Sequence, residues 1–302
     1  MRVGVSLTSA HEVDDVREGA RNMIERAAAA REAGLDSLFV GDHHLTPSPY
    51  YQNVAILGRL LAEWGDAPAG ALFLLPLWDP VLLAEQIGTL ASIHSGRFIM
   101  QCAIGRGPRE FAGMGKNIKH RPSLFEEGLD IVRRLLSGET VSSDGRYKIE
   151  GAYISPLPPE PVEVWIGASA DVAIDRAARL GDTWLASPDL TMEPARHLLT
   201  YFRERCAAYG REPTAIPIRR DVYVGESAEE AEATAGPIAG RYRGFEPEAL
   251  IYGSIDQVAE RFRELAAIGY TDVITRGMVS DQPKALASLR RLGEVRDAVA
   301  EA

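Results

Sequence analysis

The chain has few cysteines, only Cys102 and Cys206 among its 302 residues. Two cysteines exclude a framework of several disulfides and are typical of a protein kept in a reducing compartment, so we expect the cytoplasm. The N-terminal stretch lacks the apolar core of a signal peptide, since charge arrives by Glu12. The longest apolar run, residues 69–78, contains Pro76 and falls well short of the roughly 20 residues of a membrane span. We therefore expect no membrane partner.

The chain also has fewer basic than acidic residues. Lysine and arginine total 33 against 43 aspartates and glutamates, which gives a net charge of −10. Such a chain lacks the basic footprint of a general nucleic-acid-binding protein, so no nucleic-acid partner is expected. Any bound anion must be held locally, by backbone N–H groups or a few arginines. With 46% hydrophobic and 25% charged residues, the composition is that of an ordinary globular protein.

Short apolar runs alternate with longer segments of helical period along the whole chain. The runs predicted as strands are residues 3–7, 37–40, 71–75, 97–102, 162–166, 183–186, 216–224 and 272–275. Eight strand–helix units predict an α/β fold, a (β/α)8 TIM barrel formed by a single domain, residues 1–302. The competing fold is a doubly wound open sheet, which usually carries a glycine-rich phosphate loop after its first strand. Residues 7–11 contain no glycine, which favours the barrel.

Two segments interrupt the alternation. Residues 140–161 contain Asp144-Gly145, a hairpin turn signal, followed by a cluster of prolines, so we predict a β-hairpin excursion. Residues 236–253, rich in glycine, arginine and tyrosine, are interpreted as an inserted loop near the seventh strand–helix unit. Between these two segments, Ser227 with Glu230 predicts a capping box at the start of a helix.

In a TIM barrel the active site lies at the C-terminal ends of the strands, so the residues after each strand carry the information. Asp42, His43 and His44 follow the second predicted strand. Histidine titrates near neutral pH, which favours a proton donor or acceptor at this place. The same residues are metal-ligand types, or two histidines that cap a loop by hydrogen bonds. The other histidines form no ligand-spaced set, so we expect no metal site.

Small residues follow the fourth and fifth strands. Arg106 lies between Gly105 and Gly107, where the backbone can approach a ligand and a guanidinium can bind phosphate or carboxylate. Gly167, Ala168 and Ser169 open a helix, whose free N–H groups favour an anion. Ser169 is alternatively only a helix cap. Neighbouring strands bring these two loops together in a barrel, which predicts one phosphate pocket.

Taken jointly, several segments resemble the family of bacterial luciferase and related flavin-dependent oxidoreductases. The run Gly41 to Thr46 resembles the family's strand-2 segment, and residues 164–169 with 177–182 resemble its flavin-phosphate segment. The remaining similar segments are residues 74–76, 79–81, 84–86, 95–98, 111–115 and 125–127. These matches lie within roughly residues 1–190. The segment after strand 4 has fewer glycines than is usual in the family.

The resemblance implies a (β/α)8 barrel with an insertion, usually dimeric, that binds FMN or coenzyme F420. It implies that His43 is the active-site histidine and that Arg106 and Ser169, with Gly167 and Ala168, contact the coenzyme phosphate. It also implies a non-proline cis peptide in the third strand, near Ala71-Leu72 and under the flavin ring.

Four functions remain open at this stage. The first is a monooxygenase that uses reduced FMN on a small organic substrate, with a flavin reductase as a partner. The second is an F420-dependent dehydrogenase or reductase that transfers hydride. The third is a metal-dependent hydrolase using Asp42, His43 and His44. The fourth is a non-catalytic flavin-binding subunit.

Overall fold

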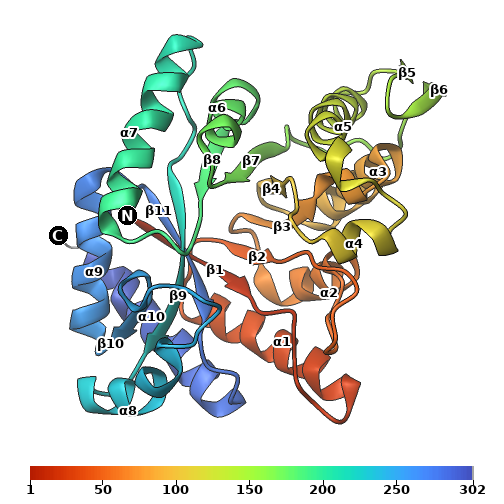
Figure 1. Ribbon diagram of the computed structural model, residues 1–302. Helices are drawn as coiled ribbons and strands as arrows, with labels where there is room; N and C mark the ends of the chain where they lie inside the picture. The colour runs from red at the N-terminus through yellow and green to blue at the C-terminus, as the bar shows by residue number, and fades with distance from the viewer. Residues whose placement is uncertain (301–302) are drawn as a thin grey trace.

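The computed structural model describes residues 1–300, in which eight parallel strands form a closed barrel (Figure 1). Each strand is hydrogen-bonded to the next, β11 returns to β1, and the pairing of Ala186 with Ile218 joins β8 to β9. The predicted (β/α)8 barrel is confirmed. The barrel strands are β1 (Arg2–Leu7), β2 (Leu38–Val40), β3 (Ala69–Leu74), β4 (Phe98–Ala103), β7 (Glu163–Ala168), β8 (Thr183–Ala186), β9 (Pro217–Val224) and β11 (Asp272–Gly277).

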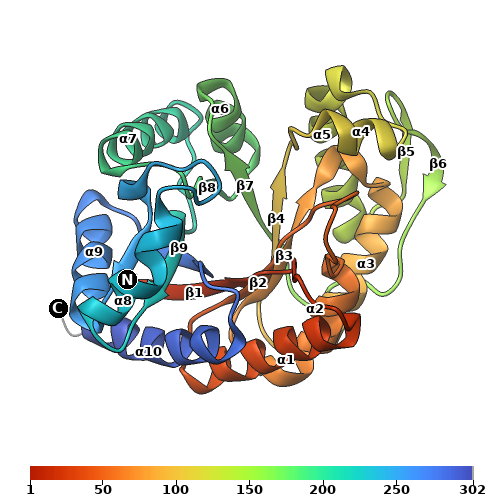
Figure 2. The ribbon, with the colours of Figure 1, turned by 60° about the horizontal axis from the view of Figure 1, so that its bottom comes forward.

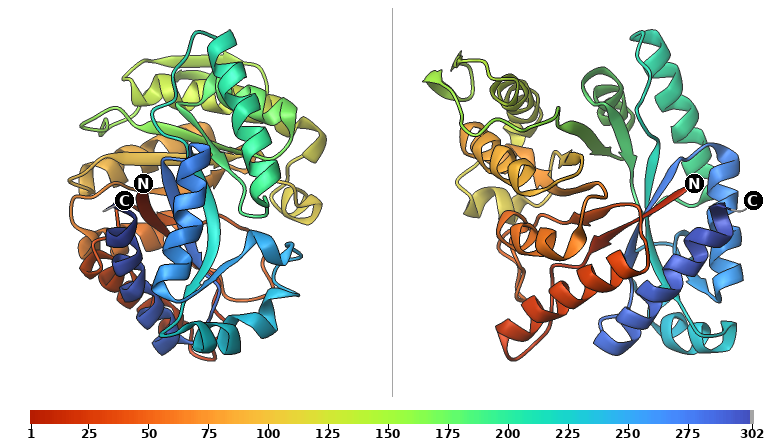
Figure 3. Two further views of the ribbon diagram at one scale, coloured as in Figure 1. Left: turned by 90° about the vertical axis from the view of Figure 1, so that its left-hand side faces the viewer. Right: turned by 180° about the vertical axis from the view of Figure 1, so that it is seen from behind.

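Helices surround the barrel on its outside (Figures 2 and 3). Outward-facing strand residues such as Val3, Val5 and Ile166 pack with the apolar faces of these helices in the main core. This burial of both strand faces explains why the strands read as continuous apolar runs. The surrounding helices are α1 (Val16–Glu32), α2 (Asn53–Trp64), α3 (Pro80–Ile93), α5 (Arg121–Leu136), α6 (Asp171–Leu180), α7 (Met192–Ala208), α9 (Ile255–Ile268) and α10 (Gln282–Ala300).

Both predicted interruptions are present. The antiparallel hairpin of β5 (Val141–Asp144) and β6 (Lys148–Ala152) lies beside α5 at the edge of the molecule (Figure 1). The insertion is more ordered than the predicted loop. It contains the end of α8 (Ala228–Ala239), a 3-10 turn (Pro247–Ala249) and β10 (Ile251–Gly253), which pairs in parallel with the end of β9. Short 3-10 turns also occupy Leu75–Leu77 and Ile118–His120.

The capping box predicted at the start of α8 is half right. The Ser227 side chain accepts a hydrogen bond from the backbone N–H of Glu230. The Glu230 carboxylate accepts from the Tyr223 hydroxyl and the Glu226 backbone N–H, and not from the backbone N–H of Ser227 as a capping box requires. A complete capping box occurs instead at α9, between Ser254 and Gln257.

Strand β2 is short, and beyond its end two buried side chains make the hydrogen bonds to β3 that a longer strand would make. Beyond Val40, β3 has no partner strand on that side. The Asn53 amide donates to the carbonyl of Leu72 at 2.7 Å, and the Asp42 carboxylate accepts from the N–H of Leu74 at 2.7 Å. Both Asn53 and Asp42 are fully buried. These two side chains therefore replace the missing strand and fix the upper part of β3.

The expected non-proline cis peptide at Ala71-Leu72 is wrong. In residues 1–300 the single cis peptide bond precedes Pro156. Ala71 pairs with β2 and β4, and Leu72 pairs with Gln101, so the strand runs without a bulge. The Ala71 side chain belongs to the core against the helices, whereas Leu72 is half-buried on the opposite face, toward the lumen.

None of the helices in residues 1–300 combines the length and the apolar character needed to cross a membrane.

The substitution Asn53→Leu tests the role of the buried amide. It leaves the Leu72 carbonyl buried without a donor, which costs about 1–3 kcal/mol of the free energy of unfolding. Chemical denaturation measures this loss. The matched control is Arg59→Leu on the same helix, which removes only an exposed ion pair with Glu63 and costs about 0.5 kcal/mol. Equal losses for the two variants would show that the Asn53 hydrogen bond does not stabilise β3.

Candidate active site at the barrel mouth

Of the three residues after β2, Asp42 and His44 lie in the barrel wall and His43 lies at the mouth. Asp42 is fully buried and accepts hydrogen bonds from Leu74 N–H and from Trp78 Nε1 at 2.8 Å. His44 is largely buried, with Nε2 at 3.3 Å from Asp42 Oδ1. The side chain of His43 is 56% exposed. Of the two histidines, only His43 is open to a ligand.

Burial raises the pKa of Asp42, while His44, the Leu74 N–H and the Trp78 N–H oppose the rise because each favours the carboxylate. The groups that hold this carboxylate are therefore part of the wall, and Asp42 positions the segment.

Glu110, which the sequence analysis did not select, holds His43 in place. It lies on α4 (Pro108–Gly113), where its Oε1 is 3.2 Å from His43 Nδ1 and accepts the backbone N–H of His44 at 3.1 Å. Helix α4 is anchored by Phe111, which packs against Leu74 and Leu77. The carboxylate at Nδ1 orients the imidazole and leaves Nε2 available to a ligand.

The two small-residue loops lie side by side, as expected from neighbouring strands. Ala103 at the end of β4 pairs with Gly167 at the end of β7. Arg106 and Ser169 follow these residues, and both are exposed. Within residues 1–300 neither side chain makes a hydrogen bond to protein, and the N-cap of α6 is Ala170, without a side-chain cap. Gly167 and Ala168 end β7 and do not open the helix as predicted. Ser169 is therefore not the helix cap, and its hydroxyl, like the Arg106 guanidinium, is free to bind an anion.

These residues fit a phosphate-bearing coenzyme. A Cβ built at Gly167 would meet only the Ala103 side chain and the Cys102 carbonyl at 3.7 Å, so the β4 and β7 ends leave space in front of them. A guanidinium, a hydroxyl and the free N–H groups of α6 are the donors that a phosphate group uses. Asp171 in the first turn of α6 is the one acidic neighbour on this helix end.

The arrangement gives no support to a metal centre. In residues 1–300 no three histidine, cysteine, aspartate or glutamate side chains converge as metal ligands. Asp42 is already bonded by Leu74 and Trp78, and His43 is directed to Glu110 instead. The described residues therefore do not provide the set of metal ligands that the hydrolase hypothesis requires.

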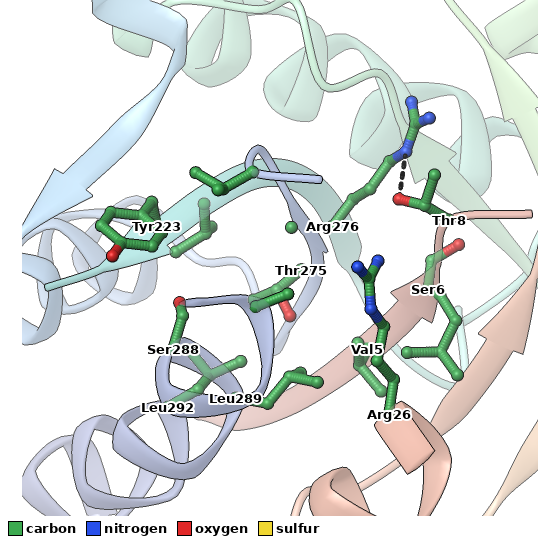
Figure 4. A pocket seen from close by; sticks show the side chains of 15 residues that line it. Val5, Ser6, Thr8, Arg26, Tyr223, Thr275, Arg276, Ser288, Leu289 and Leu292 are labelled. Atoms are coloured by element: carbon green, nitrogen blue, oxygen red, sulfur yellow. Dashed lines mark hydrogen bonds between the residues drawn. The ribbon is translucent and has the colours of Figure 1, made fainter. Parts of the chain in front are cut away.

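A cavity of about 30 Å³, room for about two water molecules, lies between the strands and helices α1 and α10 (Figure 4). It is lined by residues of β1, β9, β11, α1 and α10, among them Thr8, Arg26 and Arg276. Figure 4 shows Arg276 joined to Thr8 by a hydrogen bond of 3.3 Å. The cavity contains none of the site residues predicted from the sequence, and it is too small for a coenzyme.

The closed parallel barrel therefore carries an oriented histidine and two small-residue loops on the rim formed by the carboxyl ends of its strands, which is where TIM-barrel enzymes have their active sites. The chain belongs to the luciferase-like monooxygenase family, whose model matches residues 1–250. This membership confirms the resemblance found in the sequence.

Curated relatives match a little over half of the chain. An F420-dependent glucose-6-phosphate dehydrogenase of Kribbella flavida is 30% identical over 185 residues, 58% of this chain and 55% of the relative. The enzyme of the same name from Gordonia bronchialis is 26% identical over 181 residues, 55% and 53% of the two chains. The chain spans about half the length of these curated relatives.

Solved structures match nearly the whole chain at low identity. Monooxygenase RslO1 from Streptomyces bottropensis superposes with a TM-score of 0.87 at 18% identity, covering 97% of this chain and 98% of its own. The oxygenating constituent of 3,6-diketocamphane monooxygenase from Pseudomonas putida, in complex with FMN, gives 0.83 at 18% identity and covers 99% and 98%. An F420-dependent secondary alcohol dehydrogenase gives 0.80 at 17% identity, again over 99% and 98%. These likenesses show the shared fold.

Two glycine substitutions separate a site position from a packing position. Gly167→Ala should change the free energy of unfolding by less than about 1 kcal/mol, because the added Cβ makes only ordinary contacts. Gly70→Ala should cost about 1–3 kcal/mol or more, because its Cβ would lie 1.8 Å from the Ile99 carbonyl oxygen. Thermal or chemical unfolding compares the two. A large loss for Gly167→Ala would mean that this glycine serves packing.

Proposed function

We propose that the chain is an oxidoreductase that binds FMN or coenzyme F420 at the barrel mouth and acts on a small organic molecule. The pairing of Ala103 with Gly167 carries this proposal, because it brings the Arg106 and Ser169 loops together on the rim that also holds His43. Family membership supports the same conclusion.

The coenzyme phosphate would be held by Arg106, Ser169 and the free N–H groups at the start of α6, directly beyond Gly167 and Ala168 at the end of β7. Leu72 offers a side chain to the ring, because it faces the lumen, whereas Ala71 faces the helices and contributes backbone only. Below the mouth, an apolar layer of Phe39, Trp165 and Ile274 closes the barrel and excludes water from beneath.

The bound coenzyme would supply the redox chemistry, transfer of hydride or activation of oxygen. The chain would supply orientation and a proton. Glu110 at Nδ1 fixes the imidazole of His43, which then holds or accepts the substrate proton at Nε2.

Two reactions fit this site. The first candidate is monooxygenation with reduced FMN, supported by the family description and by the FMN complex among the structural neighbours. The second is F420-dependent hydride transfer, which the names of the curated relatives favour. A spectrophotometric titration with FMN, reduced FMN and F420 separates them, since each coenzyme has its own absorbance. Failure to bind any of the three would contradict the proposal.

The proposal extends to partners and surroundings. The first reaction requires a flavin reductase, and we propose a homodimer, as the family resemblance implies. Cys102 and Cys206 are buried free thiols, which supports a reducing compartment such as the cytoplasm.

The substitution Arg106→Ala should weaken binding of FMN about tenfold to a hundredfold, because it removes a charge-assisted hydrogen bond. The affinity for riboflavin, which lacks the phosphate, should barely change. Fluorescence titrations of both flavins measure this difference. Equal losses for FMN and riboflavin would assign Arg106 a structural role.

The substitution His43→Ala should lower turnover by about a hundredfold to ten-thousandfold, with little change in coenzyme affinity, because it removes the group that holds or accepts the substrate proton but no phosphate contact. His44→Ala is the contrasting variant. It disturbs the buried Asp42 contact and should lower stability instead. Wild-type turnover in His43→Ala would remove His43 from the chemistry.

A further inference from the structure

The strands on the far side of the mouth from the phosphate loops carry charged residues that face into the barrel. On β9 and β11, Arg219 pairs with Ile274, and Asp221 pairs with Arg276. Paired residues of parallel strands point to the same side of the sheet. Ile274 belongs to the interior layer with Phe39 and Trp165, so Arg219, Asp221 and Arg276 all point into the lumen.

The one carboxylate among them is already occupied. Asp221 is fully buried, with Oδ2 at 2.9 Å from Arg243 Nη1 and Oδ1 accepting from the Tyr242 hydroxyl at 3.4 Å. Arg243 comes from the insertion between α8 and β10 and lies over the Phe245 ring. The insertion therefore neutralises Asp221 and leaves no negative charge for the two arginines beside it.

Arg219 and Arg276 have no ionic partner in the part of the chain that the structure describes. The Nε of Arg219 is buried without a hydrogen bond, and none of its guanidinium nitrogens donates to protein. Arg276 uses only its Nε, which donates to Thr8 Oγ1 at 3.3 Å. Burial, reinforced by the positive charges of Arg276 and Arg243, lowers the pKa of Arg219 to about 10, while Asp221 and Tyr50 oppose the fall.

Such an arrangement costs stability unless something else occupies it. A buried guanidinium without partners loses hydration and gains nothing in return. Arg219 is nevertheless half-buried and not sealed off, since it stands in the lumen. Two partly exposed guanidinium groups without ionic partners, both on the lumen side of neighbouring strands, are donors that can bind an oxyanion by several charge-assisted hydrogen bonds.

Tyr50 connects these arginines to the candidate catalytic histidine. Its ring contacts His43 edge to face, with 5.8 Å between the ring centres. Burial raises the pKa of Tyr50 to about 12, and the positive charges of Arg276 and Arg219 act on its hydroxyl in the opposite direction. Tyr50 therefore contacts His43 and lies near enough to Arg276 and Arg219 for their charges to act on its hydroxyl.

We propose that Arg219 and Arg276 form a subsite for an oxyanion group of the substrate, so that the enzyme acts on small organic anions. Because Arg243 neutralises Asp221, Arg219 and Arg276 leave two uncompensated positive charges, which favours a dianionic phosphate over a monoanionic sulfonate or carboxylate. This inference rests on the proposed function, because it gives the charged end of the substrate a place in the mouth where His43 meets the reacting end.

Thermal unfolding with simple anions tests the subsite. Inorganic phosphate should raise the unfolding temperature of the wild-type protein more than methanesulfonate or acetate at equal ionic strength, because a ligand that binds only the folded state stabilises it. Arg219→Met and Arg276→Met should each weaken phosphate binding about tenfold or more. The matched control is Arg241→Met in the insertion, an exposed arginine that should leave phosphate binding unchanged.

The unfolding temperature of the variants without ligand distinguishes a binding arginine from one that stabilises the fold. Met has a similar length and no charge, so Arg219→Met should unfold at the wild-type temperature or above it, because the uncompensated buried charge is gone. A clear loss of stability in Arg219→Met, together with a phosphate response unchanged in Arg276→Met, would overturn the subsite. Absence of any phosphate response in the wild-type protein would overturn it as well.

Coenzyme titrations test the substrate subsite and the proposed coenzyme site independently of each other. Arg219→Met should bind FMN or F420 like the wild-type protein, whereas Arg106→Ala should not. A loss of FMN affinity in Arg219→Met equal to that in Arg106→Ala would assign the arginines to the coenzyme tail and overturn the substrate subsite. Phosphate binding through Arg219 in a protein that binds no flavin would contradict the proposed function but keep the anion site.

Discussion

The buried carboxylate of Asp42 is the contact on which the geometry of the mouth depends. Strand β2 ends before β3 does, and Asp42 accepts the β3 hydrogen bond that a longer β2 would have accepted. The same carboxylate connects Leu74 and Trp78 to the end of β2. By holding this residue in the wall, the fold leaves His43 on the open side. A fully buried carboxylate is costly, but two N–H donors and a neighbouring imidazole offset the cost. An acid that looks like a catalytic group or a metal ligand in the sequence is thus a piece of the scaffold.

The sequence was sufficient for the barrel because each strand is buried on both faces and each helix on one, which leaves a strong pattern of apolar runs and helical periods. It was also sufficient for the placement of the Arg106 and Ser169 loops, because neighbouring strands end at one rim. It was not sufficient for β10. This strand is three residues long and gains its stability from pairing with β9, which no local pattern records.

The site residues that escaped prediction are those whose partners come from distant parts of the chain. Glu110 lies on a six-residue helix, and its role appears only when α4 folds back over His43. Arg219 and Asp221 did leave a signal. Charged residues in the middle of a strand of a parallel barrel are rare, since such strands are buried on both faces. The apolar pattern of residues 216–224 predicts only a strand, and it does not show toward which face of the barrel the charged side chains inside it point.

Two separate groups of polar residues at the barrel mouth would bind the coenzyme phosphate and the anionic group of the substrate. The loops after β4 and β7 offer donors to a coenzyme tail, whereas the arginines lie on β9 and β11, two and three strands beyond β7 in the barrel. Two separate anion sites fix two ligands relative to each other without requiring either to be gripped along its length, so that the reacting ends meet near His43 and Tyr50. The insertion completes this division, because Arg243 neutralises Asp221 and leaves Arg219 and Arg276 free for an incoming anion. Variation in the insertion would then change which anion the barrel accepts while leaving the coenzyme loops untouched.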